Sequence, residues 1–122
     1  MLVDDDRFLL DMYSVKFREW GHTVEVCYGG EDALKKLRDG AKPDAIVLDV
    51  IMPHIDGIEL LKAIKEEKLG GSPALIVLSN QGEETDKKKA EEYGVDGYIV
   101  KASAIPSEVL ESVIAIIGKK KK

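Results

Sequence analysis

The sequence lacks several features that would place it in a large class of proteins. Its single cysteine, Cys27, cannot form an internal disulfide, so a disulfide-stabilised fold is excluded. No apolar run approaches the roughly 18 residues of a membrane-spanning helix, and no signal-peptide pattern precedes the fold. The net charge of −5 argues against a nucleic-acid-binding surface, because phosphate binding needs a basic footprint. We therefore expect a cytoplasmic protein that does not bind nucleic acid through this chain.

What the sequence does contain is typical of one globular domain. Its 122 residues are 44% hydrophobic and 34% charged, enough for a single core of useful size. Repeats and interdomain linkers are not found, and we expect one domain over residues 1–118 and a lysine-rich tail over residues 119–122. Cys27 stands among Val24, Val26 and Tyr28, which indicates a small buried hydrophobic residue.

Five short apolar segments alternate with five segments of helical periodicity. This alternation predicts a parallel sheet with helices on both faces, and five such units favour the flavodoxin-like strand order 2-1-3-4-5. The predicted strands are residues 1–3, 22–28, 45–48, 74–78 and 97–100. The predicted helices are residues 7–20, 31–38, 57–67 and 83–93, and a last helix that begins at Pro106 and ends before Gly118.

Acidic residues follow two of the predicted strands. Asp4 and Asp5 come directly after the first strand, and Asp49 comes directly after the third. In the predicted order these strands are neighbours, and their carboxyl ends meet at the switch point where open α/β sheets place their sites. Ser79 and Lys101 follow the fourth and fifth strands and belong to the same edge. Asp6 is expected to cap the following helix and not to join the acidic group.

This group of residues suggests phosphoryl chemistry. Converging carboxylates repel one another, and a divalent cation removes the conflict. Oxygen-only ligands from few protein groups suit Mg²⁺. Lys101 would supply a positive charge and Ser79 a hydroxyl, both useful against a phosphoryl group. Asp49 could then act as the nucleophile, as carboxylates do when they form aspartyl phosphates.

Four segments at the strand ends belong together as one pattern: Leu2–Asp6 (LVDDD), Ala45–Pro53 (AIVLDVIMP), Leu78–Ser79 and Tyr98–Lys101 (YIVK). They resemble the receiver domains of two-component response regulators, and the resemblance covers essentially the whole chain. It implies a phospho-accepting signalling domain that catalyses its own phosphorylation and dephosphorylation and is not otherwise an enzyme. The expected partners are a histidine kinase or histidine phosphotransfer protein and a downstream protein that binds the face of helix 4, strand 5 and helix 5.

The resemblance also implies a role for each matching residue. Asp49 would accept the phosphoryl group, and Lys101 would bind it. Asp5 would bind Mg²⁺ directly and Asp4 through water, with Asp49 and the backbone carbonyl of Ile51 completing the protein ligands. Ser79 and Tyr98 would form the switch that reports phosphorylation. The sequence departs from the family pattern after Lys101, where Ala102 replaces a usual proline, and after Ser79, where Asn80 replaces a usual very small residue.

Three other functions were weighed. A receiver-like module could dock without phosphorylation, although the residues that phosphorylation needs are present. A small aspartate-nucleophile phosphatase of the haloacid-dehalogenase kind would carry a second acid two residues after Asp49, where this chain has Ile51. FMN binding by a flavodoxin-like fold is disfavoured because the loop after the first strand is acidic and would not cradle a phosphate.

Overall fold

The computed structural model describes residues 1–50, 52, 55–79, 84–100 and 106–121. Strands and helices alternate along the chain as the sequence predicts. In order the elements are β1 (Leu2–Val3), α1 (Arg7–Glu19), β2 (Val26–Cys27), α2 (Gly30–Arg38), β3 (Ala45–Leu48), α3 (Gly57–Glu67), β4 (Ala74–Ser79), α4 (Glu84–Glu92), β5 (Gly97–Val100) and α5 (Pro106–Lys121).

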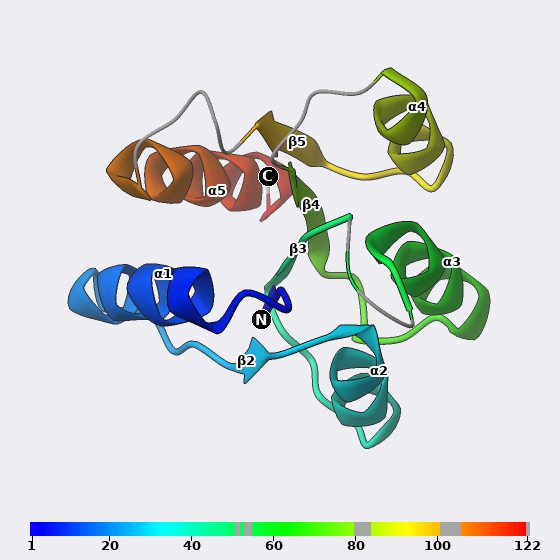
Figure 1. Cartoon of the computed structure of the whole chain (residues 1–122), viewed down its shortest axis with the longest axis horizontal. Helices are drawn as coiled ribbons and strands as arrows, with labels where there is room; N and C mark the ends of the chain where they lie inside the picture. Colours follow the sequence, from blue (N-terminus) through cyan, green and yellow to red (C-terminus); the bar gives the residue numbers. More distant parts are fainter. Residues whose placement is uncertain (51, 53–54, 80–83, 101–105, 122) are drawn as a thin grey trace.

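The strands form one parallel sheet in the order β2-β1-β3-β4-β5, which confirms the predicted fold class. Figure 1 shows α1 and α5 on one face of this sheet and α2, α3 and α4 on the other. β1, the first strand in the chain, lies between β2 and β3 in the sheet. The chain therefore reverses its direction of winding at β1. All carboxyl ends of the strands consequently lie along one edge, which is the edge that carries the candidate site.

A separate apolar cluster covers each face of the sheet. In β3, Ile46 and Leu48 contribute to the cluster beneath α2 and α3, whereas Ala45 and Val47 contribute to the cluster beneath α1 and α5. Each of these four residues is buried. A strand covered on both faces has no solvent side, and this explains why its sequence is continuously apolar instead of alternating.

The second strand is much shorter than predicted. Residues 22–28 have the β-branched composition of a strand, but only Val26–Cys27 forms one. β2 is at the edge of the sheet and pairs with β1, which contributes only Leu2 and Val3 to the ladder. Residues 22–25 have the composition of a strand but lie before it, and the Leu2 amide donates to the Glu25 carbonyl at 2.9 Å just ahead of the ladder.

Helix α1 has the predicted cap but a different buried face. The Asp6 carboxylate accepts a hydrogen bond from the Leu9 amide at 3.2 Å, and Gly21 ends the helix with a φ of 87°. Tyr13 and Phe17, which have the predicted helical spacing, are buried, and Leu10 is buried with them. Phe8 and Trp20, which the periodicity also places with the apolar residues, are 78% and 43% exposed.

The last helix is longer than predicted. α5 continues through Gly118 to Lys121 and does not end before the glycine. A glycine inside a helix costs about 1 kcal/mol relative to alanine, which is too little to stop a helix whose earlier turns are held by packing. Val109, Leu110 and Val113 supply that packing, since each is buried against the sheet. Lysines in the last turn also favour the helix C-terminus, where the helix dipole is negative.

Candidate functional site: an acidic pocket at the carboxyl edge of the sheet

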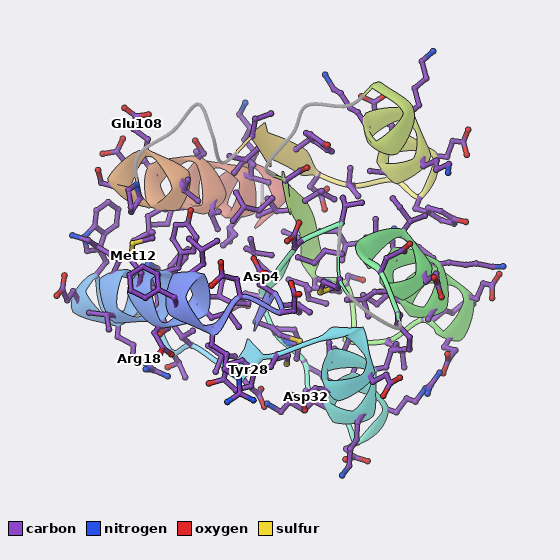
Figure 2. All side chains as sticks on the ribbon, in the orientation of Figure 1. Asp4, Met12, Arg18, Tyr28, Asp32 and Glu108 are labelled. Carbon is purple, nitrogen blue, oxygen red and sulfur yellow. The ribbon has the colours of Figure 1, made fainter. Side chains whose placement is uncertain are left out.

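The pairing of β1 with β3 brings the acidic residues together. Val3 and Leu48 are partners in the parallel register, so the residues that follow them, Asp4 and Asp49, leave the sheet side by side. The Asp49 amide donates to the Val3 carbonyl at 3.0 Å, and the Asp4 amide donates to the Cys27 carbonyl at 3.1 Å. These bonds hold the backbone of both aspartates as extensions of the ladder, and Figure 2 shows Asp4 where the chain passes from β1 to α1.

Three carboxylates form the pocket. One oxygen from each of Asp4, Asp5 and Asp49 lies within 4.8 Å of the others. Asp4 and Asp49 are only 4% and 8% exposed, whereas Asp5 is open to solvent. Burial of two neighbouring carboxylates costs free energy unless a positive charge or hydrogen-bond donors offset their repulsion. The pocket therefore has the charge of a cation site.

The size of the pocket fits Mg²⁺. Ligand oxygens lie about 2.0–2.1 Å from this ion, so two oxygens on opposite sides of it are about 4 Å apart. The observed spread of up to 4.8 Å between the three oxygens is close to that distance and needs little adjustment. One carboxylate is exposed, which leaves a side of the pocket open for water or phosphate oxygens. Such a mixed ligand set is typical of Mg²⁺ sites.

Asp6 takes a supporting part beside the pocket. Its amide donates to Oδ1 of Asp4 at 3.0 Å, which orients that buried carboxylate. Its own carboxylate is occupied with the Leu9 amide and caps α1. The prediction that Asp6 is a helix cap and stands outside the acidic group is confirmed for the part of the chain that the structure describes.

The residues predicted to form a switch, Ser79 and Tyr98, lie on the next two strands. Ser79 is the last residue of β4, is 2% exposed and pairs with Val100 of β5. Tyr98 pairs with Val77 and is half-buried against the cluster beneath α2 and α3, which extends to Ala90 of α4. Ser79 thus ends at the same edge of the sheet as Asp49, one strand further along. Lys101 and Ile51, the other two predicted site residues, lie outside the described residues, as do Asn80 and Ala102.

Two glycines beside Asp49 belong to the site although the sequence analysis did not single them out for it. The Gly57 amide donates to the Val50 carbonyl at 2.8 Å and closes the loop that follows Asp49. A Cβ on Gly57 would meet the carbonyl oxygen of Asp49. A Cβ on Gly30, at the start of α2, would lie 2.7 Å from the carbonyl oxygen of Ile55 in the same loop. No local pattern pointed to the contact between Gly30 and Ile55, which are 25 residues apart.

An arginine and a tyrosine from different segments form a cation–π pair. The Arg7 guanidinium lies over the Tyr28 ring, 4.4 Å from its centre, and joins the start of α1 to the segment after β2. Figure 2 shows Tyr28 between these two parts of the chain. The pair was missed from the sequence because 21 residues separate its members and nothing local couples them.

A hollow of about 440 Å³ lies at the opposite edge of the sheet. It is lined mainly by apolar side chains from α1, α5 and the segments that precede the strands, among them Phe17, Val24 and Val113. Its lining includes none of Asp4, Asp5 and Asp49. Size alone would point to this hollow as a ligand site, but the three clustered carboxylates lie at the other edge. We assign the candidate site by chemistry, since a cation site needs oxygen ligands and not volume.

Among the described residues, no helix is both long enough and apolar enough to span a membrane.

A five-stranded parallel sheet in this order with an acidic pocket at its carboxyl edge defines a class of signalling domain. The family model of the response regulator receiver domain matches residues 1–114, and the chain belongs to that family. It is accordingly a receiver signalling domain and not a conventional enzyme.

Particular relatives agree with this assignment. Alkaline phosphatase synthesis transcriptional regulatory protein PhoP of Bacillus subtilis is 36% identical over 119 residues, which are 98% of this chain and 48% of the relative. Transcriptional regulatory protein AfsQ1 of Streptomyces coelicolor is 32% identical over 96% of this chain and 49% of its own length. The chain thus spans about half the length of the curated relatives it matches.

Solved structures with the same fold include single receiver domains. The receiver domain of the Francisella response regulator 1452 is 30% identical, with a TM-score of 0.83, and the match covers 99% of this chain and 96% of that one. Chemotaxis protein CheY4 of Vibrio cholerae is 27% identical, with a TM-score of 0.85 and 94% of each chain covered.

Proposed function

We propose that this receiver accepts a phosphoryl group on Asp49 from a histidine kinase or histidine phosphotransfer protein, in a Mg²⁺-dependent reaction. The observation that carries the proposal is the convergence of one oxygen each from Asp4, Asp5 and Asp49 within 4.8 Å at the carboxyl edge of the sheet. Of these three, Asp49 directly follows the central strand β3 and belongs to a pocket that is open on one side. A buried carboxylate at a rigid position is well placed as a nucleophile.

The transfer conserves atoms and charge as follows. A carboxylate oxygen of Asp49 forms a bond to phosphorus while the phosphorus–nitrogen bond to the donor histidine breaks. The electron pair of the broken bond stays on the imidazole nitrogen, which then takes up a proton. Asp5, Asp4, Asp49 and the carbonyl of Ile51 would hold the Mg²⁺, which supplies neutralisation of the charge on the phosphoryl oxygens. Lys101 would bind one of those oxygens as a second positive group.

The readout would be a change of surface. A phosphoryl group on Asp49 would attract the Ser79 hydroxyl on the neighbouring strand, and the space that this movement opens would admit the Tyr98 ring. Such a step couples a local change of charge to a side chain with two positions, which is the general form of a phosphorylation switch. The affected face would be α4, β5 and α5, where a downstream protein would bind.

The test is incubation with acetyl phosphate and Mg²⁺, followed by intact-mass measurement. We expect one phosphoryl group per chain on the unchanged protein and none on Asp49→Ala. A chelator should prevent the mass gain, and Asp5→Ala should reduce it more completely than Asp4→Ala. A gain that survives Asp49→Ala would refute Asp49 as the acceptor. Normal phosphorylation of both the Asp4 and Asp5 variants would refute the metal assignment.

A further inference from the structure

The loop that follows Asp49 is seated against the first residue of α2. Gly30 begins that helix and is buried. A Cβ added to it would lie 2.7 Å from the carbonyl oxygen of Ile55, 2.9 Å from its Cβ and 2.9 Å from its Cγ2. Contacts under 3.0 Å with backbone and Cβ atoms cannot be relieved by turning a flexible side chain. Any residue other than glycine at position 30 must therefore displace either the helix or the loop.

The helix is the better anchored of the two. Ala33, Leu34 and Leu37 of α2 are all buried in the same apolar cluster, and Ala33 has no exposed surface. Packing at this density resists displacement. Lys36 adds a hydrogen bond from its ammonium to the Val26 carbonyl at 2.9 Å. A methyl group on Gly30 would consequently push Ile55 and leave α2 in place.

A displacement of Ile55 would reach Asp49 through the base of the loop. The two ends of the loop are tied together by the hydrogen bond from the Gly57 amide to the Val50 carbonyl. Gly57 in turn lies so close to Asp49 that a Cβ on it would contact the Asp49 carbonyl and would be 2.7 Å from the Val50 Cα. Ile55 is two residues before Gly57, with only Asp56 between them. A shift of Ile55 would therefore be transmitted to Asp49 through Asp56 and Gly57.

We propose that Gly30 is a positioning residue for Asp49: by leaving room for Ile55 it keeps Ile55 and Gly57, and with them the acceptor carboxylate of Asp49, in position for reaction. Gly30 touches no reacting atom and acts only through Ile55 and Gly57. This inference rests on the proposed function, because it assigns a part in the phosphorylation of Asp49. Glycine is needed at position 30 for steric reasons and not for its helix propensity. Glycine is a poor helix former, so alanine at this position would stabilise α2 if there were room for its methyl group.

Gly29 provides a matched control one residue away. A Cβ on Gly29 would meet nothing within 4 Å, and its φ of 171° is extended backbone that any residue adopts. Gly29→Ala and Gly30→Ala therefore add the same methyl group to neighbouring positions, one into open space and one against Ile55. A double variant, Gly30→Ala with Ile55→Ala, removes the Cγ2 contact while the carbonyl contact stays, so we expect it to restore part of what Gly30→Ala loses.

The experiment compares these variants at saturating acetyl phosphate and Mg²⁺, with circular dichroism to show that each is folded. Misplacement of a reacting group by a fraction of an ångström to 1 Å costs rate steeply. We expect Gly30→Ala to phosphorylate on the order of 10-fold more slowly and Gly29→Ala within about twofold of the unchanged protein. Equal rates for the two variants, or a double variant slower than Gly30→Ala, would overturn the proposal.

Amide chemical shifts separate this inference from the proposed function. In the absence of phosphodonor, Gly30→Ala should shift the amides of Asp49, Val50 and Gly57, and Gly29→Ala should leave them in place. If the unchanged protein takes up no phosphoryl group, the proposed function fails, while these shifts still decide whether Gly30 seats the loop. If Gly30→Ala does not fold, Ile55→Ala tests the same seat from the other side, and unshifted Asp49 and Gly57 amides in that folded variant would refute it.

Discussion

The buried thiol of Cys27 illustrates how tertiary structure changes the chemistry of a single residue. Its side chain has no exposed surface and lies at the end of β2 beside the Lys36 side chain. Burial raises the pKa of Cys27 to about 11, although the positive charge of Lys36 opposes the increase. A thiol with a pKa this high is protonated at neutral pH and is a poor nucleophile. Cys27 is therefore a packing residue in the native protein, as the sequence predicted.

The raised pKa predicts a loss of stability at alkaline pH. Below the unfolded-state value of about 8.5 the thiol is protonated in both states, and its contribution is fully present. As the pH rises from there towards about 11, only the unfolded chain releases the proton, so the free energy of unfolding falls by up to about 1.4 kcal/mol per pH unit. Urea unfolding of the unchanged protein and of Cys27→Ala between pH 8 and 11 measures this. Parallel curves for the two proteins would contradict the assignment.

The three consecutive aspartates divide two tasks between the acidic pocket and helix α1. Asp4 and Asp5 offer oxygens to the pocket with Asp49, whereas the Asp6 carboxylate accepts from the Leu9 amide. An N-terminal cap satisfies a backbone donor that the helix itself cannot pair. Neighbouring residues of the same type therefore support two elements with different functions. The periodicity of α1 indicated which of them was the cap, because Asp6 directly precedes the first helical residue.

At the level of the element, we expect neighbouring alanine substitutions to have opposite effects. Asp6→Ala should lower the free energy of unfolding by about 1 kcal/mol through loss of the cap and should still be stabilised by Mg²⁺. Asp5→Ala should change the metal-free stability by no more than about 0.5 kcal/mol, since Asp5 is exposed, and should lose the Mg²⁺ effect. Urea unfolding with and without Mg²⁺ measures both. Asp6→Asn, which keeps a capping oxygen, is the control, and a Mg²⁺ response retained in Asp5→Ala would contradict the division.

Helix α4 has few buried side chains over the residues whose side chains the structure describes. Over residues 87–92, where its side chains are described, Ala90 is the buried one, and Lys87, Lys88 and Lys89 are exposed. Ala90 and Tyr98 belong to the same apolar cluster, so a movement of the tyrosine ring would change the packing around Ala90, the buried residue of the helix. Elements with few buried contacts have the lowest cost of local movement. A helix with one buried side chain over residues 87–92 thus lies beside the proposed switch.

For the whole molecule we therefore predict a directed response to phosphorylation. Beryllofluoride with Mg²⁺, a stable mimic of the aspartyl phosphate, should change amide chemical shifts most over residues 79–107, beyond the pocket itself. Tyr98→Ala should leave the shifts of Asp4, Asp5 and Asp49 responsive and reduce those in α4. Changes that stay within the segments carrying the three aspartates would argue for a receiver-like module without a switching face. Nuclear magnetic resonance of the labelled chain makes the comparison directly.

Much of this architecture follows from local sequence because its causes are local. The continuous apolar runs of β3 and β4, the helical spacing of α1 and α5 and the acids directly after β1 and β3 each depend on a few adjacent residues. From these runs the parallel sheet, its strand order and the meeting of Asp4, Asp5 and Asp49 follow, since parallel strands end at a common edge. The residues of the candidate pocket could be named for the same reason.

Other features were decided only when distant segments came together. β1 pairs with only two residues of the predicted second strand, and Phe8 is exposed although its spacing matches that of the apolar residues. The contact of Ile55 with Gly30 joins residues 25 positions apart, and neither carries a local signal of the other. Sequence pattern determines which face of an element is apolar, because that follows from period and hydrophobicity. Which atoms then meet, and how closely, depends on packing in three dimensions, which in this protein sets Ile55 against Gly30.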